Sequence, residues 1–182
     1  MTKPTTIYFG PDGGELRESK NKIYLRTLLY TTGKRGRIIE NMFVRIKHRE
    51  TAQNFSVWVH GDTNLVRGSG LYVPETGVLA NHHFLLQGQQ ESFNFSHGIY
   101  SVEIYVTYMG QRKSYLLMQI QLNLTIELAH ELKKMDGKGV YFDWSPDNQT
   151  YYSHSKSPPP KPKLPVFLLD SALSDDKEIN AS

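Results

Sequence analysis

The chain has 182 residues, of which 38% are hydrophobic, and a formal net charge of +3; this length suits one domain with a sizeable core and an appendage. It contains no cysteine, which excludes disulfides, thiolate catalysis and cysteine zinc sites. No apolar run approaches the ~20 residues of a membrane span, and no apolar segment follows Met1–Pro4. We therefore expect a cytoplasmic protein with no membrane partner.

Short segments typical of strands fill the N-terminal half of the chain. With Gly-, Pro- and Asn-containing turns between them, they cover residues 7–9, 23–30, 38–49, 54–60, 71–73 and 82–87. In segment 54–60 three apolar residues fall on one face: Phe55, Val57 and Val59. Because side chains alternate along a strand, this parity predicts that Trp58 and His60 point outward.

A β-hairpin is predicted between His97 and Leu124, where two alternating runs flank the turn Met109–Arg112. In the first run the residues of one face are Tyr100, Val102, Ile104, Val106 and Tyr108. In the second run they are Leu116, Met118, Ile120, Leu122 and Leu124. Two runs of period two around a Gly-containing turn are typical of a hairpin with one buried face.

The pattern changes after Thr125. Residues 126–134 have near-helical spacing and end shortly before Gly137, which predicts a short helix. Residues 140–144 are typical of a short strand, and residues 157–165 include five prolines. We expect three parts: a β-sandwich domain (1–127), an extension that packs on it (128–157) and a proline-rich, polar tail (158–182).

The residues His97-Gly98-Ile99-Tyr100 resemble the corner before the penultimate strand of immunoglobulin-like sandwiches, where a tyrosine hydroxyl bonds back to the main chain. The resemblance covers residues 20–125. It implies an all-β, antiparallel sandwich of about seven strands, with the Tyr100 hydroxyl bonded to backbone near residues 94–97. It also implies strands B, C, F and G at 38–49, 54–60, 100–108 and 114–124.

Positive charge is concentrated between residues 17 and 49, which hold ten Lys or Arg against two acidic residues, so this segment is +8 and the remainder −5. Five of these residues form a candidate nucleic-acid-binding set: Arg35, Arg37, Arg45, Lys47 and Arg49. Alternation places the last three on one solvent-facing side with Phe43, opposite a buried row of Met42, Val44 and Ile46. Such a face can bind single strands by stacking and phosphate contact, although a solvated sheet face has the same pattern.

No motif for catalysis is present in the sequence. Arg67-Gly68-Ser69-Gly70 is not a nucleophile elbow, and no pair of acids is placed as a glycosidase requires. His82 and His83 are adjacent in a predicted strand and point to opposite faces, so a metal site would need His60, His97 or Asp62 to converge on one of them. We expect no enzymatic activity, no cofactor and no metal.

The sequence therefore favours a non-catalytic binding or assembly module that contacts a protein partner or a second copy of itself. Its candidate contact surface is a sheet face with five residues: Trp58, His60, Tyr105, Tyr115 and Leu117. The aromatic C-terminal extension is a second candidate for the contact, or a cover for that face. The alternative function is a nucleic-acid-binding sandwich that uses the basic 34–49 segment.

Overall fold

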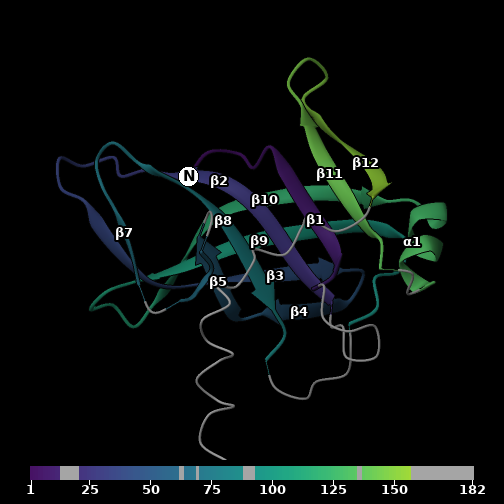
Figure 1. Cartoon of the computed structure of the whole chain (residues 1–182), viewed down its shortest axis with the longest axis horizontal. Coiled ribbons are helices and arrows are strands. Elements are labelled where there is room, and N and C mark those ends of the chain that lie inside the picture. The colour runs from purple at the N-terminus through teal and green to yellow at the C-terminus, as the bar shows by residue number, and fades with distance from the viewer. Residues whose placement is uncertain (13–20, 62–63, 69, 88–92, 135–136, 157–182) are drawn as a thin grey trace, which may run out of the picture.

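The computed structural model describes residues 1–12, 21–61, 64–68, 70–87, 93–134 and 137–156, which form two antiparallel sheets and one short helix (Figure 1). The seven-stranded sheet has the order β12-β11-β1-β2-β8-β5-β6. Its strands are β1 (Thr6–Pro11), β2 (Asn21–Leu29), β5 (Val57–Gly61), β6 (Val66–Arg67), β8 (Val78–Leu85), β11 (Gly139–Ser145) and β12 (Thr150–Lys156). The second sheet has the order β10-β9-β3-β4, and β7 pairs with β3. Its strands are β3 (Arg37–His48), β4 (Thr51–Phe55), β7 (Leu71–Val73), β9 (Gly98–Tyr108) and β10 (Ser114–Leu124).

The core lies between the inner faces of the two sheets, which confirms the predicted all-β sandwich. Strand β9 shows how the alternation produces it: Val102, Ile104 and Val106 are fully buried, whereas Tyr105 and Thr107 on the other face stay partly exposed. The same cluster holds apolar side chains from both sheets, so each sheet buries one face against the other.

The tyrosine corner predicted at Tyr100 is confirmed. The Tyr100 hydroxyl donates a hydrogen bond of 2.7 Å to the main-chain carbonyl of Ser96. The side chain is fully buried, and its ring stacks on His48 at 4.4 Å between centroids. This bond ties the segment that enters β9 to the strand itself.

The predicted helix is also confirmed, as α1 (Ile126–Lys133). Thr125 caps its N-terminus, because the Thr125 side chain accepts a hydrogen bond from the Leu128 N–H. Ala129 is buried against the sandwich. In Figure 1, α1 lies at one end of the sandwich and β7 at the other.

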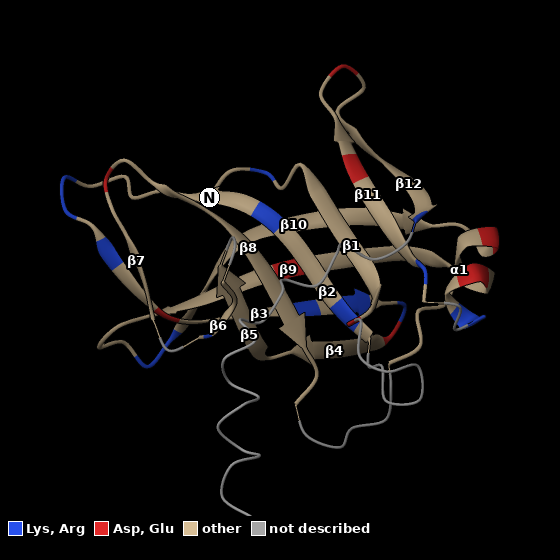
Figure 2. Cartoon of the chain, in the orientation of Figure 1, with Lys and Arg blue, Asp and Glu red and all other residues tan. Residues whose placement is uncertain are grey.

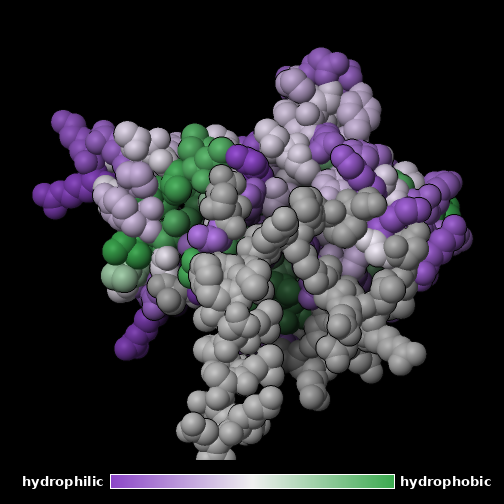
Figure 3. Space-filling model, viewed as in Figure 1, coloured by the Kyte–Doolittle hydropathy of each residue, from purple (hydrophilic) through white to green (hydrophobic). Residues whose placement is uncertain are grey.

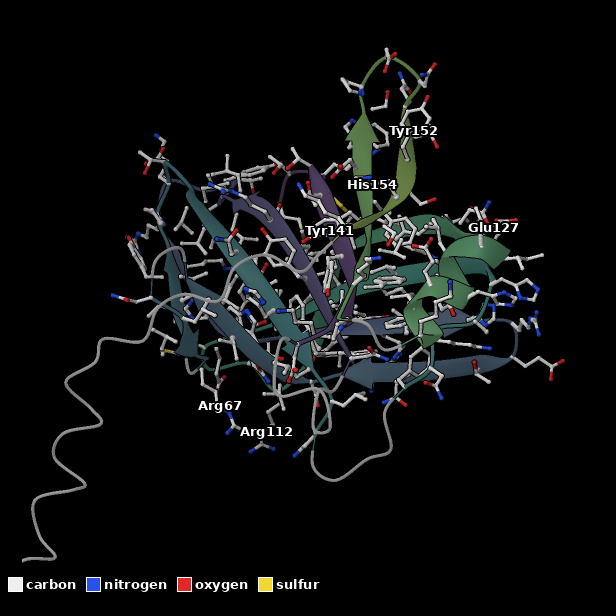
Figure 4. The ribbon with its side chains drawn as sticks, turned by 45° about the vertical axis from the view of Figure 1, so that its right-hand side comes forward. Arg67, Arg112, Glu127, Tyr141, Tyr152 and His154 are labelled. Atoms are coloured by element: carbon white, nitrogen blue, oxygen red, sulfur yellow. The ribbon has the colours of Figure 1, made fainter. Side chains whose placement is uncertain are left out.

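The C-terminal extension is built into the seven-stranded sheet. The expected short strand over residues 140–144 is β11, which pairs with β1 on one side and with β12 on the other. The hairpin of β11 and β12 projects from the body, and Figure 4 shows Tyr141, Tyr152 and His154 along it. It therefore lengthens one sheet instead of lying across the outer face of the other. The tail expected at 158–182 lies outside the described residues.

The expected strand over residues 54–60 was wrong. The chain passes from one sheet to the other at Ser56, between β4, which pairs with β3, and β5, which pairs with β8. The letters B and C were also wrong, because β3 pairs directly with β9, whereas strands B and F of an immunoglobulin-like sandwich belong to opposite sheets.

Candidate binding surface at the loop end

The predicted aromatic sheet face does not exist as one surface, because Trp58 and His60 belong to the core. Trp58 is 2% exposed and His60 is 8% exposed. The change of sheet at Ser56 resets the alternation, so Phe55 and Trp58 both point inward. The Trp58 indole N–H donates to Nδ1 of His82 at 3.1 Å, which satisfies the tryptophan inside the sandwich.

A β-bulge in β10 separates the remaining three residues of that predicted face. Leu116 pairs with Tyr105 and Met118 pairs with Ile104, so Leu117 is an extra residue in β10. Before Leu117, the alternation of inward and outward side chains is therefore the opposite of the alternation that the sequence predicted. Leu116, not Leu117, lies beside Tyr105 on the outer face. Leu117 turns inward and packs against the core. The expectation that Tyr115 and Leu117 share the outer face with Tyr105 was therefore wrong.

On the outer face of the five-stranded sheet, the basic side chains of β3 are held by neighbouring side chains. Lys47 Nζ lies 2.6 Å from Oε1 of Glu103 on β9, and Figure 2 shows basic β3 beside this acidic position. Arg45 Nε donates to Oδ1 of Asn54 at 2.9 Å, and its guanidinium lies 5.3 Å from the ring centre of Tyr105. Lys47 and Arg45, which we call the outer-face row of β3, are therefore both engaged by neighbouring side chains.

Glu103 is 4% exposed although it lies on the outer side of the sheet. Burial raises the pKa of this carboxyl, but hydrogen bonds from Lys47 and Tyr105 outweigh that effect and hold the pKa below its ordinary value. The Glu103 carboxylate therefore stays ionised at neutral pH and fixes both donors in place.

The five residues of the candidate nucleic-acid-binding set do not share one face. Arg49 lies in the turn after β3 with a φ of 54°, away from the outer-face row. Arg35 is exposed on the connection between β2 and β3. Arg37 begins β3, and its guanidinium lies 4.2 Å from the ring centre of Tyr108. Arg35 and Arg37 thus belong to an end of the sandwich.

That end gathers residues from both predicted sets, and we call it the loop end: residues 30–38, β7 and residues 108–117. The segments are joined by main-chain contacts, since Ile38 pairs with Tyr72 and the Met109 N–H donates to the Ile38 carbonyl. Six large apolar side chains are between 36% and 60% exposed there: Tyr30, Ile38, Tyr72, Met109, Tyr115 and Leu116. Figure 3 shows apolar surface near this end, on the side of the seven-stranded sheet.

The loop end also encloses a half-open cavity of about 650 Å³ between the two sheets. Its floor is made of core side chains: Leu29, Ile39, Val73, Tyr108 and Leu117. Its rim is the β2–β3 connection, with Lys34, Arg35 and Arg37, and none of the described residues that line it is acidic. The loop end therefore combines exposed rings, an apolar hollow and a basic rim.

A glycine sets the shape of this rim. The Tyr72 ring lies against the main chain of Gly36, and a Cβ at position 36 would overlap that ring. Glycine is the residue that allows such a close approach. Arg112, in the turn between β9 and β10, adds a further cation to the loop end and projects outward in Figure 4. The sequence indicated Arg35, Arg37, Tyr115 and Leu117 as candidate binding residues, but it placed them in two separate sets.

The histidines converge only in part. His60 and His82 face each other inside the sandwich with their ring centres 6.5 Å apart, and His83 is on the opposite face of β8. Burial lowers the pKa of His82 to about 3, with further lowering from His60 and His83. Among the described residues no third metal-ligating side chain joins the pair. The arrangement is a neutral core pair beside Trp58.

Within the described part of the chain, no helix is both long enough and apolar enough to span a membrane. Comparison of the sequence with protein-family models and with curated proteins found no match.

Proposed function

We propose that the chain is an immunoglobulin-like, non-catalytic binding module that uses its loop end to hold an acidic surface of a protein partner. The fold part of the proposal is supported by strand order. In the seven-stranded sheet, strands A, B, E and D would be β1, β2, β8 and β5. In the five-stranded sheet, strands G, F, C and C′ would be β10, β9, β3 and β4. With this correspondence, both sheets have the immunoglobulin-like order. The Tyr100 corner then lies at the start of strand F, as in that class.

One observation carries the functional part: the loop end combines large exposed rings, exposed cations and an apolar hollow. Tyrosine, methionine and arginine are the residue types enriched at protein interfaces. The binding loops of immunoglobulin variable domains are those between strands B and C and between F and G, and they lie at one end of the sandwich. Residues 30–36 and 109–113 occupy these positions in the proposed correspondence.

The charge of the loop end selects the chemistry of the partner. Lys34, Arg35 and Arg37 project from the rim, and none of them is within ion-pair distance of a carboxylate among the described residues. An acidic segment would gain long-range attraction to this end. An apolar side chain of the partner would fill the cavity beside the β2–β3 connection.

Charge reversal at the rim tests the proposal. Extract of the native host is passed over immobilised wild-type protein, Arg35→Glu/Arg37→Glu and a matched control, Lys133→Glu/Lys134→Glu, at the far end on and beside α1. We expect one protein to be retained by the wild type and the control and lost on the rim variant. Equal retention by all three would refute the loop end as the binding surface.

A second candidate function is the binding of single-stranded nucleic acid, favoured by the same exposed tyrosines beside cations. The outer-face row offers it less support, because Lys47 is paired with Glu103. Treatment of the extract with nuclease separates the two candidates. Retention that disappears with nuclease, together with oligonucleotide binding that falls steeply with salt, would favour nucleic acid.

A further inference from the structure

The apolar surface at the loop end extends beyond its cavity. The cavity of about 650 Å³ has an apolar floor, and the six large apolar side chains of the loop end are at least 36% exposed. The outer face of the seven-stranded sheet adds Leu79, which is 52% exposed and pairs with Leu28 near the end of β2. Apolar patches with a polar rim mark contact sites on proteins. This surface therefore suits an apolar occupant.

The sequence that follows β12 has matching chemistry. Residues 157–165 include five prolines, and residues 166–169, which we call the apolar segment, are Val-Phe-Leu-Leu. Residues 170–182 hold four acidic residues and one lysine, a net charge of −3. The rim of the cavity presents three exposed cations: Lys34, Arg35 and Arg37. An apolar segment followed by negative charge is thus complementary to an apolar hollow with a basic rim.

The register of the seven-stranded sheet gives the distance between the end of β12 and the cavity. Ser155 pairs with Val140 and Val140 with Phe9, which pairs with Ile23 of β2. Leu29, which lines the cavity, lies six residues further along β2. At ~3.3 Å per residue along the strand and ~4.8 Å for each of the three strand spacings, the separation is about 25 Å.

The chain after β12 is long enough to span this separation. Phe167 follows Ser155 by twelve residues. Proline-rich sequence favours an extended conformation of ~3.1 Å per residue, so twelve residues reach about 37 Å. Strand β12 runs away from the loop end, so the chain must first reverse its direction. The margin of about 12 Å corresponds to roughly four residues, the length of a β-turn.

We propose that the apolar segment of this chain occupies its own loop-end cavity, with the acidic residues that follow on the basic rim. The chain's own segment is favoured over a separate molecule, because a short linker gives it an effective concentration on the order of millimolar. The contact is autoinhibitory: the partner of the loop end has to displace the apolar segment. This inhibitory consequence rests on the proposed function, whereas the contact itself does not.

A spin label on the full chain tests the contact. The sequence has no cysteine, so Ser171→Cys provides a single site for a nitroxide. Paramagnetic broadening of amide NMR signals then identifies the residues that lie near the label. We expect loss of signal intensity for residues 30–37 and no loss for α1, at the opposite end of the sandwich (Figure 1). Undiminished signals from residues 30–37 would overturn the proposal.

Variants of the labelled chain test the chemistry and the reach. Phe167→Ser/Leu168→Ser should abolish the broadening, and Arg35→Glu/Arg37→Glu should weaken it. The matched control Lys133→Glu/Lys134→Glu should leave it unchanged. Deletion of residues 157–163 leaves five residues between Ser155 and the end of Phe167, at most about 18 Å of chain, and should also abolish it. Broadening that survives the serine variant or the deletion would refute the contact.

A mixing experiment distinguishes the chain's own segment from that of a second copy. Isotope-labelled chain without a nitroxide is combined with unlabelled chain that carries one. Broadening at residues 30–37 in this mixture, equal to that in the singly labelled chain, would overturn the proposal in favour of exchange between copies. Its absence from the mixture supports a contact within one chain.

Extract from the native host separates this inference from the proposed function. Phe167→Ser/Leu168→Ser should retain more of the partner than the wild type, because its loop end is no longer occupied. Unchanged retention would overturn the autoinhibitory role. If the broadening is present but the wild type and Arg35→Glu/Arg37→Glu retain the same proteins, the proposed function fails and the contact within the chain stands.

Discussion

Acidification should destabilise this protein through His82, which is fully buried beside Trp58. The unfolded chain binds a proton at this ring below about pH 6.5, whereas burial lowers its pKa in the folded protein to about 3. The folded state therefore binds fewer protons than the unfolded state between these values. Stability should fall as the pH drops from about 6.5 towards 3.

The magnitude follows from the two pKa values. Each pH unit inside this window costs ~1.4 kcal/mol per histidine, so His82 alone should remove about 2 kcal/mol between pH 6.5 and pH 5. His83, whose pKa is lowered to about 4 mainly by burial, adds to the slope in the same direction. Protonation at Nδ1 of His82 also removes the acceptor of the Trp58 indole N–H, which gives the cost a structural origin.

The assay is urea unfolding followed by circular dichroism at a series of pH values. The comparison is His82→Gln, which keeps a hydrogen-bond acceptor near Trp58 but does not titrate. We expect the free energy of unfolding to fall less steeply in His82→Gln, with a difference of about 1.4 kcal/mol per pH unit between pH 6 and pH 4. Parallel curves for the two proteins would refute a buried, neutral His82.

Three further changes test the packing described above. Tyr100→Phe removes the donor to the buried Ser96 carbonyl and should lower the free energy of unfolding by about 1–3 kcal/mol in urea titration; no loss would contradict the corner. Lys47→Ala leaves the Glu103 carboxylate with a weaker set of partners and should cost about 1 kcal/mol at neutral pH, since Lys47 is half exposed. That cost should shrink in acid as the Glu103 carboxyl, whose pKa lies below its ordinary value, becomes protonated; a pH-independent deficit would argue against the ion pair. Gly68→Ala places a Cβ against the Trp58 ring and should cost about 1–3 kcal/mol by overpacking, an expectation refuted by an unchanged melting temperature.

The local pattern of the sequence determined the parts of the structure that depend on neighbours along the chain. Alternation in residues 100–108 identified the buried face of β9, and the helical spacing after Thr125 identified α1. The corner at Tyr100 is also local, because its bond spans four residues. In each case the side chain and its partner are fixed by the same short segment.

Only the tertiary structure decided which sheet each strand joins and where the alternation of inward and outward side chains is interrupted. Trp58 is buried because the chain changes sheets at Ser56, and Leu117 turns inward because β10 bulges against β9. The pairing of β11 with β1 joins residues more than a hundred positions apart. The loop end likewise assembles from three separated segments. Alternation fixes only that neighbouring side chains face opposite ways, so the face that meets the core is set by the partner strands, which lie far away in the sequence.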